Sequence, residues 1–166
     1  EALINRLGFN NSGANKVSSR IKSSPPNGLF GINIGPNKDT KNRIEDYLIG
    51  LRKFYNLADY LTVNISSPNT ENLRSFHNSN ELTELLSEIE NEKKILKSNI
   101  PIVVKISPDI YDNDVEKISE LLLKYNISSV IISNSTDSNR ENLKNINKLE
   151  KGGLSGKPLE VKSNLL

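Results

Sequence analysis

The chain has 166 residues, with 22 basic and 20 acidic side chains, one histidine and no cysteine, methionine or tryptophan. Without cysteine it can form no disulfide or thiolate metal site, and a single histidine, His77, argues against histidine metal sites and Ser-His-Asp triads. The basic residues are interleaved with acidic ones, which argues against a nucleic-acid partner.

In chain order, the apolar pattern alternates between short strands and amphipathic helices. A weak strand candidate at 2–4 comes first, followed by a buried strand at 29–35, a helical face at 44–55 and a strand at 60–66. A helical face at 82–89, a strand at 102–107, a helical face at 115–125 and a strand at 129–134 complete the order. Asn78 and Asn113 each precede a glutamate by three residues and resemble helix N-caps.

This alternation predicts an α/β fold whose parallel sheet is covered on both faces. Asn33, Asn64 and Lys105 each sit late in an apolar strand. Burying such groups without partners is costly, so their recurrence at strand ends suggests a shared polar ligand. The carboxyl ends of the strands are where (β/α)8 barrels keep their active sites. We therefore expect an incomplete (β/α)8 TIM barrel with about four to five of its eight βα units.

The segment 63–70 (VNISSPNT) brings hydroxyls and carboxamides to the end of one strand. Carboxamides donate and accept hydrogen bonds together, which suits a cyclic amide or imide ligand. An ordinary Asx or Ser turn is the alternative, and for Lys105 the alternative is a lysine that reaches outward to solvent. The polar segment 136–151 is interpreted as a functional lid or as a loop with some local structure.

Five segments match, in order and with similar spacing, the motifs of one family. They are 5–11 (NRLGFNN), 31–35 (GINIG), 59–70 (DYLTVNISSPNT), 103–109 (VVKISPD) and 152–159 (GGLSGKPL). From about residue 3 to its end, the chain resembles class 2 dihydroorotate dehydrogenase. The resemblance implies a flavin-dependent barrel that oxidises dihydroorotate to orotate in pyrimidine synthesis and passes electrons to a membrane quinone.

The resemblance also implies roles for individual residues. Ser67 is expected to be the general base, and serine at this position, in place of the cysteine of class 1, indicates class 2. Lys105 is expected to lie against the FMN ring, where an ammonium stabilises the charge that develops on reduction. The other expected FMN contacts are Asn33, Asn64, Ser133 and Gly156. The expected substrate contacts are Asn5, Arg6, Leu7, Gly8, Phe9, Asn64, Asn69, Asn134 and Ser135.

Some positions depart from the family. Pro36 follows Gly35 where lysine is usual, Asn72 replaces a glycine, and Phe76-His77 stands where Leu-Gln is common. These changes fall mostly on loop tips, and His77 is interpreted as a surface-loop residue and not as a catalyst. Two other readings remain open, namely a related flavin barrel that acts on a different pyrimidine ring and an inactive remnant that cannot hold flavin alone.

The chain is shorter than the roughly 250 residues of a whole barrel and lacks an initial methionine. We therefore expect residues 1–166 to be the central part of one flavin-binding barrel domain, truncated at both ends. The resemblance places the quinone contact in a missing N-terminal segment. The full-length protein is expected at the periphery of a bacterial inner membrane, on its cytoplasmic face, or of the mitochondrial inner membrane. The chain itself has no membrane-length apolar run, so we expect it to be soluble, to bind FMN poorly and to be inactive alone.

Overall fold

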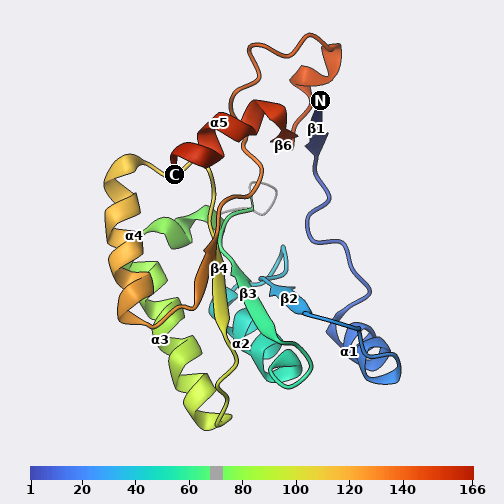
Figure 1. Cartoon of the computed structure of the whole chain (residues 1–166), viewed down its shortest axis with the longest axis vertical. Helices are drawn as coiled ribbons and strands as arrows, with labels where there is room; N and C mark the ends of the chain where they lie inside the picture. Colours follow the sequence, from blue (N-terminus) through green and yellow to red (C-terminus); the bar gives the residue numbers. More distant parts are fainter. Residues whose placement is uncertain (68–72) are drawn as a thin grey trace.

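The structure is a computed structural model that describes residues 1–67 and 73–166. Its central feature is a parallel sheet in the order β2-β3-β4-β5, formed by Gly31–Ile34, Tyr60–Asn64, Ile102–Lys105 and Ser129–Ile131. Helices α2 (Arg43–Phe54), α3 (Ser79–Ile95) and α4 (Asp112–Lys124) connect these strands in order (Figure 1). This arrangement confirms the expected α/β class and the four firmly expected parallel strands.

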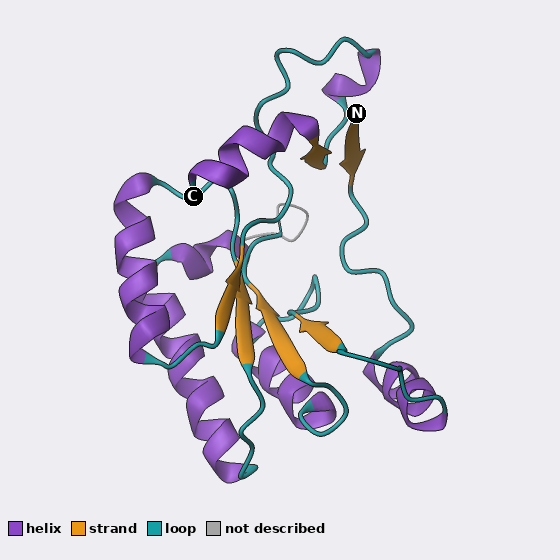
Figure 2. Ribbon diagram, viewed as in Figure 1, coloured by secondary structure: helices purple, strands orange, loops and turns teal. Residues whose placement is uncertain are grey.

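One face of this sheet forms the core with the helices. Side chains alternate between the two faces of a strand, so Leu61 and Val63 of β3 share a face with Val104 of β4, and all three are 0% exposed. They join one apolar cluster with the buried faces of α2, α3 and α4, which lie on the same side of the strands in Figure 2. The opposite face carries Asn33, which is exposed. Helices α2, α3 and α4 thus cover one face, as on a barrel wall, and the expected cover of the second face is incomplete among the described residues, since Asn33 is exposed.

A second sheet joins the two ends of the described chain. Strand β1 (Ala2–Asn5) pairs antiparallel with β6 (Gly153–Gly156), with Ala2 opposite Gly156. The weak candidate at 2–4 is thus a strand, but it lies outside the parallel sheet, and its Leu3 is 63% exposed. Gly156 has φ +90°, and a Cβ there would lie 2.6 Å from the Glu1 carbonyl oxygen. Only glycine allows the two backbones to approach so closely.

Two α-helices were not predicted from the sequence. Helix α1 (Ala14–Ser23) carries few apolar residues, and α5 (Lys157–Leu165) begins with a proline in its first turn. The 3₁₀ helices are η1 (Leu73–His77) and η2 (Ile146–Leu149). No helix among the described residues is long and apolar enough to cross a membrane.

The segment 136–151 has local structure of its own. It contains η2, and Thr136 forms an isolated antiparallel bridge with Leu154. The guanidinium of Arg140 donates to the carbonyls of Lys148, Glu150 and Gly152, which ties the segment back on itself. These contacts favour the second of the two expectations, a loop with local structure, over a free lid.

The two expected helix caps have different outcomes. The Asn78 side chain accepts a hydrogen bond from the Asn80 amide and caps α3, as expected. Asn113 lies inside the first turn of α4, whose N-cap is Tyr111, so that expectation is wrong. The spacing to a glutamate was the same in both cases, but Asp112 already extends α4 ahead of Asn113.

Tyr47 of α2 connects the helix layer to the end of β3. It is 0% exposed, and its hydroxyl donates to the Asn64 carbonyl oxygen at 2.7 Å. Burial raises the pKa of Tyr47, so the phenol stays protonated and remains a donor. This bond fixes the backbone at the point where β3 leaves the sheet.

We expect Tyr47→Phe to lower the free energy of unfolding by about 1–2 kcal/mol, because the substitution removes a buried donor and keeps the ring. The edge-on contact of the ring with Phe76, at 5.8 Å between centroids, should survive. Urea denaturation measures the change. Tyr55→Phe, at the half-buried C-cap of the same helix, is the control and should have a smaller effect.

Candidate functional site

The candidate site lies at the carboxyl ends of the parallel strands. Asn64 of β3 and Lys105 of β4 are direct register partners, so their side chains leave the same face of the sheet. Asn33 of β2 pairs with Thr62, two residues before Asn64, and shares that face. Asn64 is buried, Lys105 is half-buried and Asn33 is exposed. Three of the residues expected to bind a ligand therefore belong to one face, opposite the helix-covered core.

A chain of hydrogen bonds links the ends of β3 and β5. Ser66, which is 0% exposed, donates from its hydroxyl to Asn64 Oδ1 at 2.6 Å and accepts from Asn134 Nδ2 at 2.8 Å. Asn134 Oδ1 in turn accepts from the Ser135 amide at 2.7 Å. Asn64, Asn134 and Ser135, expected in the substrate shell, thus meet through Ser66, a residue to which the sequence analysis gave no role.

Ser67, the expected general base, follows Ser66 directly. Its side chain is 6% exposed, just beyond the end of β3. A buried serine in a site with several donors is the setting that proton abstraction by a hydroxyl needs, because bulk water would otherwise compete for the same hydrogen bonds. Asn69, expected to contact substrate, lies outside the described residues.

Lys105 is the cation of this face. It is half-buried at the end of β4, and no carboxylate of the described residues forms an ion pair with it. The expected contact of Lys105 with the FMN ring stays a prediction.

The remaining expected contacts are placed elsewhere. In the segment from Asn5 to Phe9, Leu7 is 68% exposed, and Arg6 pairs at 3.0 Å with Glu150. Ser133 exchanges a hydrogen bond with Ser163 of α5 at 2.6 Å. Gly156 lies in β6 against β1, and this close approach of the two backbones requires glycine whether or not the residue contacts a cofactor. Phe9, by contrast, lies near the end of β3, because a Cβ on Gly35 would be 3.7 Å from the Phe9 ring and 3.9 Å from the Asn64 carbonyl oxygen.

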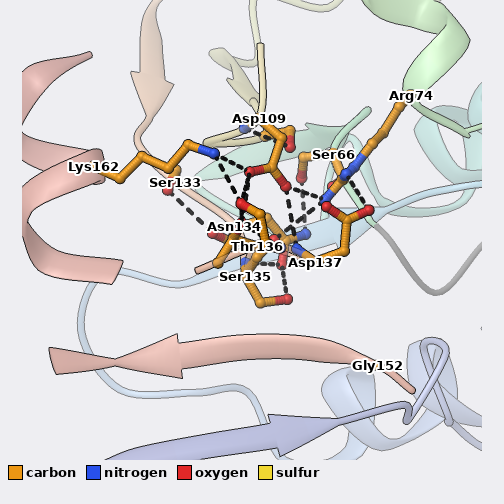
Figure 3. Close-up of polar contacts among 12 residues, drawn as sticks. Ser66, Arg74, Asp109, Ser133, Asn134, Ser135, Thr136, Asp137, Gly152 and Lys162 are labelled. Atoms are coloured by element: carbon orange, nitrogen blue, oxygen red, sulfur yellow. Dashed lines mark hydrogen bonds and ion pairs between the residues drawn. The ribbon is translucent and has the colours of Figure 1, made fainter. Parts of the chain in front are cut away.

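A carboxylate that is largely shielded from solvent connects several loops at the same end of the sheet (Figure 3). Asp109, in the segment after β4, accepts at Oδ1 from the Thr136 hydroxyl at 2.6 Å and from the Ser138 hydroxyl at 3.3 Å. The same oxygen binds the Lys162 ammonium of α5, and Oδ2 pairs with Arg74 Nη2 at 3.0 Å. The Asp109 side chain is 12% exposed. We call these five residues the Asp109 cluster.

The Asp109 cluster keeps its central carboxylate ionised. Burial alone would raise the pKa of Asp109, but hydrogen bonds from Lys162, Thr136 and the Asp137 amide, with the charge of Arg74, lower it to about 2. The carboxylate is therefore negative at every pH at which the protein would work. The sequence did not predict this cluster. Asp109 ends the motif 103–109, but nothing in the sequence shows which cations contact it.

His77 is not the surface-loop residue that we expected. It ends η1 and is half-buried, and its Nε2 has no hydrogen-bond partner among the described residues. Burial, then the positive charge of Arg74, lowers the pKa of His77 to about 4, although Asp114 and Asp109 oppose the shift. His77 is therefore neutral near pH 7, and nothing in its contacts makes it a catalyst.

This pKa predicts a loss of stability in mild acid. The unfolded chain takes up a proton near pH 6.5, whereas the folded protein resists protonation down to about pH 4, so falling pH favours unfolding between these values. We expect up to about 2 kcal/mol of the free energy of unfolding to be lost from this source between pH 7 and 5. Urea denaturation of His77→Gln at the two pH values should show a smaller loss than the wild type.

No three His, Asp or Glu side chains of residues 1–67 and 73–166 come together in a way that could hold a metal ion. On the face that bears Asn64 and Lys105, the polar groups at the ends of β3 and β4 and next to Asn134 are carboxamides, hydroxyls and the Lys105 ammonium. This set suits an organic ligand with amide and anionic groups.

Comparison with known proteins decides the family. The sequence profile described as dihydroorotate dehydrogenase matches residues 1–164. The chain belongs to this family. The relatives include proteins named dihydroorotate dehydrogenase (quinone) from Acinetobacter baylyi, 45% identical over 98% of this chain and 51% of the relative, and from Idiomarina loihiensis, 46% identical over 98% of this chain and 50% of the relative. The resemblance to class 2 is thereby confirmed.

Solved structures agree with this family membership. The ligand-free dihydroorotate dehydrogenase of Eimeria tenella superposes with a TM-score of 0.91 at 32% identity, covering 99% of this chain and 52% of that one. The complex of the Eimeria enzyme with ferulenol gives 0.90 at 31% identity, covering 97% and 50%. The fold of the chain is therefore part of the TIM barrel of this family. The chain spans about half the length of the relatives that it matches.

Proposed function

We propose that the full-length protein oxidises dihydroorotate to orotate in de novo pyrimidine biosynthesis and passes the electrons to a membrane quinone. The observation that carries this proposal is the placement of Asn64 and Lys105 side by side on one face, with the buried Ser67 just beyond. The relatives named dihydroorotate dehydrogenase (quinone) support the same activity. Residues 1–166 would then be the central part of one barrel domain.

The residues present suit FMN and a cyclic amide substrate. Asn33, Asn64 and Lys105 would hold the flavin, with Ser133 and Gly156 as further contacts; when bound, FMN supplies a hydride acceptor. Ser67 takes the proton from the ring carbon next to the substrate carbonyl. Carboxamides orient the substrate, because they can pair with both the N–H and the C=O of its ring. The substrate contacts would be Asn64, Asn69, Asn134, Ser135 and the segment from Asn5 to Phe9.

In the complete protein, a segment N-terminal to this chain would contact the quinone. The protein would lie at the periphery of the cytoplasmic face of a bacterial inner membrane, or of the mitochondrial inner membrane. The chain of 166 residues alone would hold little FMN and show no turnover, because Asn33, one of the expected flavin contacts, is exposed to solvent and would leave that part of the flavin hydrated.

A substrate panel on the purified full-length protein tests the proposal. Dihydroorotate should reduce the bound flavin, and an added quinone should reoxidise it, whereas dihydrouracil should give no reduction. Reduction by dihydrouracil alone would favour the alternative, a related flavin enzyme that acts on another pyrimidine ring. Absence of flavin from the full-length protein would favour the inactive remnant.

A further inference from the structure

Arg74 is the residue through which the Asp109 cluster reaches the backbone next to Ser67. All three nitrogens of its guanidinium are engaged. Nε donates to the Ser66 carbonyl oxygen at 3.5 Å, and Nη2 donates to the Ser135 carbonyl oxygen at 3.4 Å while it pairs with Asp109 Oδ2 at 3.0 Å. One guanidinium thus bonds to the segments that follow β3 and β5, and it pairs with carboxylates of the segments that follow β4 and β5.

Two carboxylates pair with Arg74, but only one of them is shielded from water. Asp137 Oδ2 lies 2.9 Å from Nη1, and its side chain is 59% exposed. The Asp109 side chain is 12% exposed, and it is fixed by further bonds from Thr136 and Lys162. An exposed ion pair contributes little, whereas a buried and fully hydrogen-bonded pair holds its partner in one geometry. Asp109 is therefore the anchor of Arg74, and Asp137 is a minor partner.

We propose that Asp109 is a positioning residue that acts through Arg74 to hold the backbone immediately before the expected base, Ser67. This inference rests on the proposed function, because it concerns the geometry of that reaction. The carbonyl that Arg74 binds belongs to Ser66, the direct neighbour of Ser67. A small displacement of a reacting group costs a large factor in rate, so the loss of this anchor slows proton abstraction without removing a group that touches the ligand.

The test compares Asp109→Asn with Asp137→Asn in the flavin-loaded full-length protein. Both variants remove one negative charge from the same arginine, and each replaces the carboxylate with an amide of similar size. We expect Asp109→Asn to slow flavin reduction by dihydroorotate by about 10- to 100-fold, with orotate affinity and flavin content changed less than about threefold. Asp137→Asn should leave all three within about threefold of the wild type.

A second readout needs no activity. Hydrogen–deuterium exchange of the amides of Ile65, Ser66 and Ser67 should become faster in Asp109→Asn and stay unchanged in Asp137→Asn. Should the wild type fail to oxidise dihydroorotate while this exchange pattern holds, the proposed function fails and the anchoring role stands. Equal rates and equal exchange in the two variants would overturn the inference.

If Asp109→Asn does not fold, Arg74→Lys tests the same inference. A lysine keeps the charge beside Asp109 but cannot reach the Ser66 and Ser135 carbonyls at the same time, because it has no planar fork of donors. The inference requires the same slow reduction with retained orotate affinity. A normal reduction rate in Arg74→Lys overturns it, and so does a parallel loss of flavin, orotate affinity and rate.

Discussion

Replacing Ser67 with alanine should abolish most dihydroorotate oxidation in the full-length protein while leaving its flavin in place. A general base contributes about 10²- to 10⁴-fold to the rate, so a fall of this size is expected in the rate of flavin reduction by dihydroorotate. Ser67 is 6% exposed at the end of β3, which makes direct replacement by a water molecule difficult. Stopped-flow absorbance of the bound flavin measures this step separately from the later reaction with quinone.

Two controls distinguish lost chemistry from a damaged site. Orotate should bind Ser67→Ala with near wild-type affinity, because the carboxamides that surround the substrate are unchanged. Ser67→Cys should retain part of the activity, since class 1 members of the family carry cysteine at this position. A Ser67→Ala protein that reduces its flavin at the wild-type rate would show that another group takes the proton.

Removing the charge of Lys105 should have the next largest effect. Lys105→Met keeps the length of this half-buried side chain beside Asn64 and removes its ammonium. We expect the purified full-length protein to lose most of its FMN, or to reduce the remaining FMN more than about 10-fold more slowly. The reason is that a cation next to the ring favours the negative charge gained on reduction.

The flavin content is read from the ratio of visible to ultraviolet absorbance. Lys117→Met, on the exposed face of α4, changes the net charge by the same amount and should leave both flavin content and reduction unchanged. If Lys105→Met keeps its flavin and reduces it at the wild-type rate, the assignment of Lys105 to the cofactor is wrong.

The elements with strong periodicity could be predicted from the sequence alone. Buried strands appear in the sequence as short apolar runs, and amphipathic helices as apolar residues every three or four positions. The sequence therefore predicted β2 to β5 and α2 to α4 in the right order. Helix α1 could not be predicted this way, since its apolar side chains are few. The pairing of β1 with β6 was also hidden, because it joins segments at opposite ends of the chain and no local pattern encodes such a partner.

The candidate site likewise has a part that the sequence predicts and a part that it does not. Asn64 and Lys105 were noticeable because a polar residue within an apolar strand has an energetic cost, and strand register then placed them side by side. The Asp109 cluster was not noticeable. Asp109, Arg74 and Lys162 are ordinary charged residues in the sequence, and they meet only after the connections that follow β3 and β4 and helix α5 have taken their final positions.

The antiparallel pairing of β1 with β6 bears on the order in which the protein folds. Each strand pair of the central sheet joins neighbouring βα units, such as Gly31 with Tyr60 or Val103 with Ser129, and so closes a far smaller part of the chain than the pairing of Ala2 with Gly156. The β1–β6 ribbon has to close nearly the whole chain, which carries a larger entropic cost and delays such contacts. The segment from Asn5 to Phe9, which we expect to contact substrate, begins at the last residue of β1, so it would reach its final position late and open again before the central sheet does.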